Sequence, residues 1–353
     1  MLTEQLSRAF ADSGTGNAEV VRELEARFAQ FCGAAHALCV SSGTAALISA
    51  LRAAGVQSGD KVGVSVLGPS MTGLAVAATG ARALFLDCAS STSFGVSGAA
   101  AKHAIQAGIS AAVLVPMWGY WDENEDALGA FREARVPIIV DAAQAPFLRL
   151  RRSLLSVADF VCLSLHGRKP FKAGEGGVCL TDDARLAERI LALRNFGQDA
   201  AFTGSRLDPT GPFAVHFGVN LKINGLGAAW CLSQLDEADR VRARLDSLRQ
   251  VGVAAFGNTK ISWAEASQSA EVQEHGRYGI VALCPTETDA RELTQVIEAS
   301  GVEVDSSRYK YRPMYAAPYL ARFATECPSA EQLTTRVVAC RLEAFAAGLE
   351  NGR

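Results

Sequence analysis

Short apolar runs alternate with longer amphipathic segments through the first two-thirds of the chain, and this alternation constrains the fold more than any other feature. The apolar runs have the length of strands and lie at 36–40, 61–66, 83–87, 112–117, 137–140, 159–165 and 177–180. Helix-periodic segments lie between several of them, at 45–54, 123–134 and 185–195. Such alternation favours parallel strands joined by crossover helices. We therefore predict an α/β fold with a mostly parallel central sheet covered by helices on both faces.

The pattern changes after a polar segment at 197–212, where glycine and proline recur and a long loop is expected. One long helix is predicted at 225–250. A smaller α+β unit follows, with strands expected near 260–263, 279–284 and 302–305 and helices at 286–300 and 329–347. The predicted organisation is a large domain over residues 1–250 and a small C-terminal domain over residues 251–353.

Charge and hydropathy exclude several classes of protein. Lys and Arg number 34 against 37 Asp and Glu without an extended basic cluster, so we expect neither a nucleic acid nor a membrane surface as partner. No apolar run approaches the roughly 18 residues that a membrane helix needs. Glu4, Arg8 and Asp12 interrupt the N-terminal segment where a secretory signal would be apolar. These observations predict a cytoplasmic protein.

The cysteines and histidines do not form metal-binding motifs. The nine cysteines include no C-x-x-C pair, and most lie in apolar runs, as Cys39, Cys162 and Cys179 do. This is typical of buried thiols in a reducing compartment. The histidines lack the spacing of metal ligands, so we expect no metal site.

Three groups of polar residues follow predicted strands, at the edge of a parallel sheet where ligands bind. The strand at 36–40 runs into Ser41, Ser42, Gly43 and Thr44 and then a helix. Free backbone N–H groups and hydroxyls there meet the positive end of a helix dipole, which suits a phosphate. An ordinary helix N-cap has the same sequence, so this group alone does not decide between the two.

The other two groups are a carboxylate and an amine. Asp141 ends the apolar run at 137–140 and Gln144 follows it, while Lys169 comes soon after the strand that carries Ser164. A buried carboxylate is costly unless it meets a cation or strong donors. Together with a phosphate cradle, the two groups suit pyridoxal phosphate (PLP), whose ring nitrogen needs a carboxylate and whose aldehyde needs an amine. We therefore predict PLP as the cofactor.

Three motifs then resemble a known family. SSGTAAL at 41–47, VDAAQA at 140–145 and S-x-H-x-x-K-x-x-x-x-GEGG at 164–177 are similar to the nucleotide-sugar aminotransferases of the DegT/StrS type, which are fold-type-I PLP enzymes with a small C-terminal α+β domain. The resemblance implies that Lys169 forms a Schiff base with PLP, that Asp141 pairs with the pyridinium nitrogen, and that Gln144 lies beside the ring phenolate. It also implies that phosphate is held by the residues Gly43, Thr44 and Ser164.

A fourth segment bears on assembly. FGVNLKINGLGAA at 217–229 resembles the family's F-G-Y-N-Y-R-M segment, whose asparagine reaches the phosphate of the partner subunit. The resemblance therefore implies that Asn220 binds cofactor in the neighbouring subunit. We expect a homodimer with shared active sites.

The sequence departs from the family on the substrate side. The stretch that usually places an aromatic residue over the cofactor ring reads Gly-Pro-Ser-Met-Thr-Gly at 68–73, where Pro69 or Gly73 takes the stacking position and Met71 is an alternative cover. Lys222 replaces the arginine of the asparagine motif, and a lysine cannot bind a carboxylate bidentately. Tyr315 stands where a substrate-facing histidine is expected.

The resemblance and the intact cofactor residues predict a PLP-dependent aminotransferase. We expect it to move an amino group from glutamate or glutamine to a keto-sugar, a keto-cyclitol or another small ketone in a biosynthetic pathway. Two other interpretations stay open. One is a PLP-dependent dehydratase or other non-transaminating enzyme on the same scaffold, and the other is a catalytically degenerate partner subunit.

Overall fold

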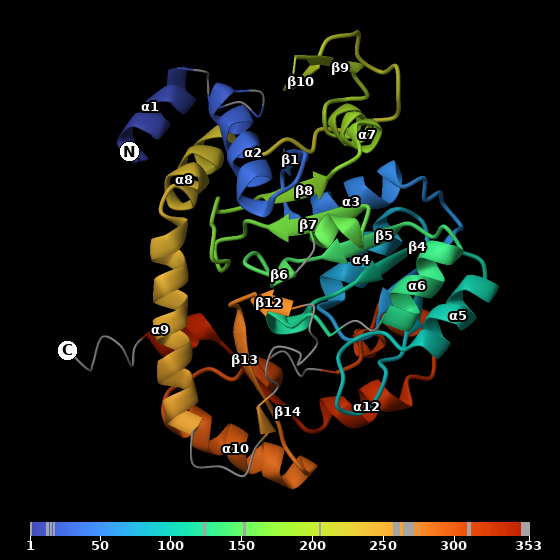
Figure 1. Ribbon diagram of the computed structural model, residues 1–353, viewed down its shortest axis with the longest axis vertical. Coiled ribbons are helices and arrows are strands. Elements are labelled where there is room, and N and C mark those ends of the chain that lie inside the picture. Colours follow the sequence, from blue (N-terminus) through green and yellow to red (C-terminus); the bar gives the residue numbers. More distant parts are fainter. Residues whose placement is uncertain are drawn as a thin grey trace.

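The computed structural model describes residues 2–11, 14, 16, 18–122, 125–150, 153–204, 206–256, 262–263, 272–274, 276–308 and 312–346. Its centre is a seven-stranded sheet with the order β1-β8-β7-β5-β4-β2-β3 (Figure 1). The strands are β1 (His36–Val40), β2 (Lys61–Ser65), β3 (Arg82–Leu86), β4 (Ile109–Leu114), β5 (Ile138–Asp141), β7 (Phe160–Ser164) and β8 (Gly177–Thr181). Only β8 runs against its neighbours. The prediction of a mostly parallel sheet is confirmed.

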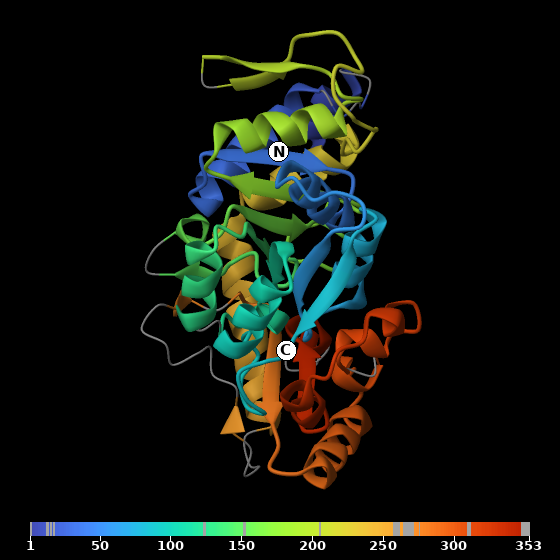
Figure 2. The same ribbon diagram turned by 90° about the vertical axis from the view of Figure 1, so that its right-hand side faces the viewer.

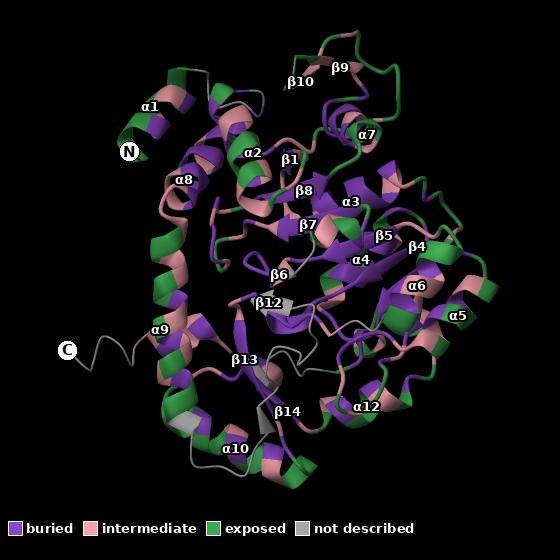
Figure 3. Ribbon diagram, in the orientation of Figure 1, coloured by how far each residue is buried: buried purple, intermediate pink, exposed green. Residues whose placement is uncertain are grey.

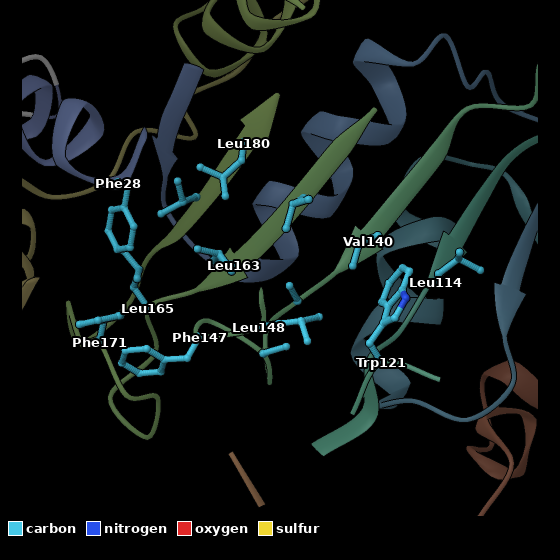
Figure 4. Packing of buried hydrophobic residues seen from close by; sticks show 14 of the residues in the cluster. Phe28, Leu114, Trp121, Val140, Phe147, Leu148, Leu163, Leu165, Phe171 and Leu180 are labelled. Carbon is cyan, nitrogen blue, oxygen red and sulfur yellow. The ribbon is translucent and has the colours of Figure 1, made fainter. Parts of the chain in front are cut away.

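Helices cover both faces of this sheet, because alternate side chains of each strand enter one of two hydrophobic clusters. Val140 packs toward one face with Leu114, whereas Ile139 packs toward the other with Val113. The first face is covered by α2 (Glu19–Cys32), α5 (Gly98–Gln106), α6 (Glu125–Glu133) and α8 (Gly225–Leu235), and α1 (Leu2–Ala11) lies against α8. The second face is covered by α3 (Gly43–Ala53), α4 (Ser70–Ala78) and α7 (Ala184–Arg194). Figure 3 shows the central strands as the buried layer, and Figure 4 shows the first cluster, where Phe28 lies near Leu180 and Leu163.

A buried ion pair fixes the end of β1, from which the first polar motif begins. Arg194 of α7 donates to Glu25 of α2 and also to the backbone oxygen of Cys39, and the Cys39 N–H donates to Glu25 at 2.8 Å. Ser41 N donates to the oxygen of Leu221 at 2.7 Å. The chain therefore leaves β1 at a position set by two helices and by the segment that carries Asn220.

The C-terminal unit is built on a second sheet, in which β13 (Gly279–Leu283) lies between β11 (Ser262–Trp263) and β14 (Val337–Arg341). Its helices are α10 (Glu287–Ala299), α11 (Asp305–Arg308) and α12 (Pro328–Thr334). Short 3-10 turns lie at Met117–Gly119, Leu154–Ser156, Met314–Ala316, Leu320–Phe323 and Leu342–Phe345. A further small sheet pairs β12 (Val272–Glu274) with β6 (Arg149–Leu150), and so joins the C-terminal part of the chain to the first unit.

The prediction of one long helix at 225–250 is wrong. Helix α8 ends at Leu235 and α9 begins at Ala238 and continues to Phe256. Helix α8 packs against α2, with Asp236 just past its end pairing with Arg27 at 2.7 Å, whereas α9 packs against β13 and the turn at Leu342–Phe345, so the two helices follow different partners. Helix α9 then runs down to the C-terminal unit (Figure 1). Apolar residues recur at helical spacing through both helices, so the sequence pattern gave no sign that the packing partner changes between them.

Three further elements differ from the predictions. Residues 302–304 form no strand, and Asp305 begins α11 instead. The helix expected at 329–347 is a short helix followed by β14, because the β-branched pair at 337–338 continues the sheet against β13. The polar segment at 197–212 contains a hairpin of β9 (Ala200–Thr203) and β10 (Arg206–Pro209), which projects at the far end from the C-terminal unit (Figure 2). Residues 123–124 and 260–261 of two predicted elements lie outside the described residues.

No helix in the described part of the chain is long and apolar enough to cross a membrane.

Candidate active site

A cavity of about 590 Å³ opens at the carboxyl ends of β1, β5 and β7. It is lined by seven of the eight site residues that the sequence predicts: Ser42, Gly43, Thr44, Asp141, Gln144, Ser164 and Lys169. The C-terminal unit closes the cavity with Arg312 and with three side chains that the sequence analysis missed: Tyr278, Asp305 and Arg341. The two units therefore form one site.

The N-terminus of α3 forms an oxyanion cradle at one end of this cavity. The Ser42 hydroxyl accepts from the N–H of Ala45 at 3.0 Å and caps the helix. The N–H groups of Gly43 and Thr44 donate to no residue that the structure describes. A Cβ on Gly43 would lie 2.9 Å from the Cβ of Ser164, so glycine is needed there for the close approach of α3 to the end of β7. Backbone donors, a helix dipole and the Ser164 hydroxyl together suit a phosphate.

Asp141, at the end of β5, also lines the cavity, and 5 % of its surface is exposed. Its Oδ2 accepts from the Thr72 hydroxyl at 2.6 Å, and its Oδ1 accepts from the N–H of Ala143 at 3.2 Å. Burial raises the pKa of this carboxyl, while the two hydrogen bonds and the charge of Lys169 oppose that rise. Within the described residues Asp141 has donors but no ion-pair partner, so a protonated ring nitrogen would fit this position.

Lys169 lies between the two units. Its Nζ is 4.7 Å from the centre of the Tyr278 ring, and its backbone N–H donates to His166 at 2.8 Å. Burial lowers the pKa of Lys169 to about 8; the charge of Asp141 raises this pKa and that of Arg341 lowers it. About a tenth of the amine is therefore neutral at pH 7, far more than for an ordinary lysine, and the neutral form is the one that acts as a nucleophile or a proton acceptor.

Gln144 and Trp118 are held together at the cavity wall. Gln144 Oε1 accepts from the N–H of Trp118 at 2.6 Å, and Trp118 has a left-handed backbone with φ of 52°. This bond fixes the orientation of the amide, and the Gln144 NH₂ donates to no described residue. A neutral donor in this place suits a ring oxygen.

The model of the DegT/DnrJ/EryC1/StrS aminotransferase family matches residues 3–344. The chain belongs to this family. The resemblance of the three motifs is thereby confirmed, together with the α/β fold.

Two relatives and one solved structure illustrate the likeness. The chain is 30% identical to the spore coat polysaccharide biosynthesis protein SpsC of Bacillus subtilis, over 70% of this chain and 63% of that protein. It is 29% identical to an L-glutamine:scyllo-inosose aminotransferase of Streptomyces griseus, over 77% of this chain and 66% of that protein. Just under two thirds of each relative is spanned. A putative sugar aminotransferase of Streptococcus pneumoniae, solved in its PLP form, shares the fold with a TM-score of 0.81 at 17% identity, over 99% of this chain and 94% of that one.

Asn220 is the predicted site residue that the structure does not bring into the cavity. Its exposed side chain accepts from the N–H of Lys222 at 3.3 Å. Lys222 also lies outside the cavity, with its Nζ 4.2 Å from the centre of the Phe196 ring. Within a single chain, neither residue contributes to the wall of the site.

The packing around Gly73 accounts for one of the departures from the family. Pro69 and Met71 line the cavity, but Gly73 does not. A Cβ on Gly73 would lie 2.8 Å from both Met314 and Leu320, so the C-terminal segment occupies the space where an aromatic side chain at 73 would lie.

Tyr315 belongs to the same C-terminal segment but does not line the cavity, although Met314 and Ala316 do. Its hydroxyl donates to Glu331 at 2.5 Å, and its ring packs edge-on against Phe85. The tyrosine at the family's histidine position therefore faces away from the site.

Several residues of the site were not predicted, for different reasons. Thr72 does not line the cavity but donates to Asp141 from the first turn of α4, and its place in the Pro-Ser-Met-Thr-Gly stretch after β2 was a signal in the sequence. Tyr278 immediately precedes β13, and Arg341 ends β14, which pairs with β13. The segment of Arg341 was predicted to be helical, so the sequence did not indicate that these residues reach the cavity. His166, Arg168 and Glu175 also line the cavity, whereas Lys172 does not. No cluster of three or more potential metal ligands occurs in the described ranges.

We expect Thr72→Val to weaken PLP binding, because it removes the hydroxyl that donates to Asp141 while nearly keeping the side-chain volume. A buried charged acceptor that loses one donor costs about 1–3 kcal/mol, which is roughly a tenfold to hundredfold rise in the dissociation constant of PLP. Equilibrium titration with PLP measures it, and Thr72→Ser, which keeps the hydroxyl, is the control. Equal PLP affinity in Thr72→Val and the natural protein would show that this bond does not support the carboxylate.

Proposed function

We propose that the protein is a PLP-dependent aminotransferase that takes the amino group of glutamate or glutamine and passes it to a keto-sugar, a keto-cyclitol or another small ketone. The observation that carries this proposal is the meeting of three groups in one cavity: the α3 cradle, the buried Asp141 and the Lys169 amine. Each fits a different part of PLP, and the family membership supports the same assignment.

In this proposal each residue of the site has a separate role, which follows from its chemistry. PLP, when bound, supplies an aldehyde and an electron-withdrawing ring. Gly43, Thr44 and Ser164 bind its phosphate, and Asp141 holds the proton on the ring nitrogen. Lys169 would hold the cofactor at rest, and its Nζ would then take a proton from the substrate Cα and deliver it to C4′ of the cofactor, so that the amino group stays with the cofactor. The lowered pKa of Lys169 suits this role, since the base must be neutral to accept the proton.

The size and charge of the cavity support compact substrates. A volume of about 590 Å³ is in the usual range for small-molecule sites and leaves room for a cofactor and a small second molecule. Arg168 and Arg312 at its wall favour an anionic group on at least one substrate. The Streptomyces relative, named for glutamine and a cyclitol ketone, is consistent with this choice.

An exposed apolar face supports the expected homodimer. Around Asn220, exposure ranges from 40% to 73% for the side chains of Phe196, Phe213, Val215, Phe217 and Val219. Several large apolar side chains exposed on these segments, with the Phe196 and Phe213 rings 6.1 Å apart, favour a protein–protein contact. We infer that a second copy covers this face and that Asn220 thereby reaches the partner's cofactor. All nine cysteines are unpaired, which supports a reducing compartment such as the cytoplasm.

We expect the PLP-loaded protein, mixed with glutamate or glutamine, to convert PLP to pyridoxamine phosphate in a single turnover with release of one equivalent of keto acid. Lys169→Ala should slow this by at least about a hundredfold, because the proton-transfer group is lost. Lys172→Ala is the matched control and should keep the activity, since Lys172 lies outside the cavity. Chromatography of the cofactor and keto acid measures both.

The acceptor is tested with the same protein in its pyridoxamine form. A keto-cyclitol and a nucleotide-linked keto-sugar are compared for the rate at which each restores PLP. Faster reaction of the nucleotide-linked sugar would contradict the compact acceptor. Failure of both amino donors, or activity that depends on Lys172 instead of Lys169, would contradict the aminotransferase itself.

Light scattering should give a mass of twice the 37.2 kDa of one chain. In that dimer, Asn220→Ala should weaken PLP binding by about 1–3 kcal/mol, because the phosphate loses a donor. A mixed dimer of one Asn220→Ala chain and one Lys169→Ala chain separates the two geometries. If Asn220 acts in the partner's site, one of the two sites is intact and binds PLP with natural affinity. A stable active monomer, or mixed dimers with no intact site, would rule out the shared site.

A further inference from the structure

Arg312 differs from the other arginine of the C-terminal unit that lines the cavity. Arg341 is committed to Asp305, because its Nε lies 3.0 Å from each carboxylate oxygen. Arg312 is exposed at the cavity wall and forms no hydrogen bond or ion pair with any residue that the structure describes. A guanidinium without an acceptor, inside a cavity built for a small molecule, is available to a ligand.

The backbone of Arg312 is nevertheless held in place. The next two residues, Pro313 and Met314, are buried, and the N–H of Met314 donates to the oxygen of Val66 at 2.8 Å. Met314 also packs so closely on α4 that a Cβ on Gly73 has no room. The start of the Arg312 side chain is thus fixed relative to the end of β2, on the same sheet edge as the cofactor groups. Less backbone freedom is therefore lost on binding than at an arginine in an unsupported surface loop.

The carboxylates of the cavity do not reach Arg312. Asp141 accepts from Thr72 and Ala143, and Asp305 is held by Arg341. Glu175 is 70% exposed and lies 3.7 Å from His166. Lys222, which takes the place of the family's arginine, lies over the Phe196 ring outside the cavity. Within the described residues of one chain Arg312 thus has no carboxylate partner, and the substrate is the source of an oxyanion in the cavity.

We propose that Arg312 binds the α-carboxylate of the amino donor. This rests on the proposed function, in which every candidate donor carries a carboxylate next to the carbon that bears the amine. A guanidinium matches that group with two parallel N–H···O bonds. The phosphates of a nucleotide-linked acceptor offer related chemistry, but a compact keto-cyclitol carries no acid. Arg312 is thus a specificity-determining residue for the first half of the reaction.

The test measures the two half-reactions separately in Arg312→Gln and Arg312→Lys. In the donor half-reaction, Arg312→Gln should raise the half-saturating glutamate concentration at least about tenfold, with a smaller effect on the maximal rate. Arg312→Lys should recover part of the loss. The acceptor half-reaction of the pyridoxamine form should be unchanged. Arg322→Gln is the matched control, because Arg322 stacks on Tyr319 and does not line the cavity.

A binding measurement keeps this result separate from the proposed function. Glutarate, a dicarboxylate without an amine, is titrated into the PLP-loaded protein by calorimetry, and Arg312→Gln should weaken its binding by a similar factor. Unchanged glutamate saturation and glutarate binding would overturn the proposal, as would an effect confined to the acceptor half-reaction. If no donor converts the cofactor, the proposed function fails, and the glutarate titration alone then decides whether Arg312 binds a carboxylate.

Discussion

Burial of a carboxylate and an amine in the same cavity is the constraint on which the rest of the site depends. Asp141 ends a strand that is covered on both faces, so its charge is costly unless donors meet it. Thr72 from α4 and the N–H of Ala143 provide two donors. Lys169 is placed where burial lowers its pKa and where the Asp141 charge limits that decrease. A ligand with a cationic ring nitrogen and an electrophilic carbon satisfies both groups at once.

The two structural units contribute to this constraint in different ways. The sheet edge supplies the phosphate cradle, Asp141 and Lys169. The C-terminal unit supplies Tyr278 over the Lys169 amine, and the Arg341–Asp305 pair, whose charges act on the same amine in opposite directions. The pKa of Lys169 therefore reports on the packing of the two units against each other. The same packing explains why position 73 is a glycine, because Met314 and Leu320 take the space above it.

The sequence predicts an element correctly where its local hydrophobic pattern matches the burial of that element in the folded protein. Strands of the central sheet are buried on both faces, so they read as continuous apolar runs, and the residues at their ends were found with them. The pattern fails where tertiary contacts override it. The break between α8 and α9 falls where the packing partner changes from α2 to the C-terminal unit, and β14 depends on its pairing with β13. Arg341 was missed because it lies on that strand, and the role of Asn220 stays a prediction because it involves a second chain.

The most direct test of this account is the pH dependence of Lys169 acylation by an amine-reactive reagent, followed by peptide mapping between about pH 6 and pH 11. Only the neutral amine reacts, so the labelling rate should rise with pH and reach half its plateau near pH 8, where the lowered pKa lies. Asp141→Asn should move this midpoint to lower pH, because it removes the negative charge that raises the lysine pKa. A midpoint near the ordinary value of 10.5, unmoved by Asp141→Asn, would contradict a buried amine coupled to a buried carboxylate.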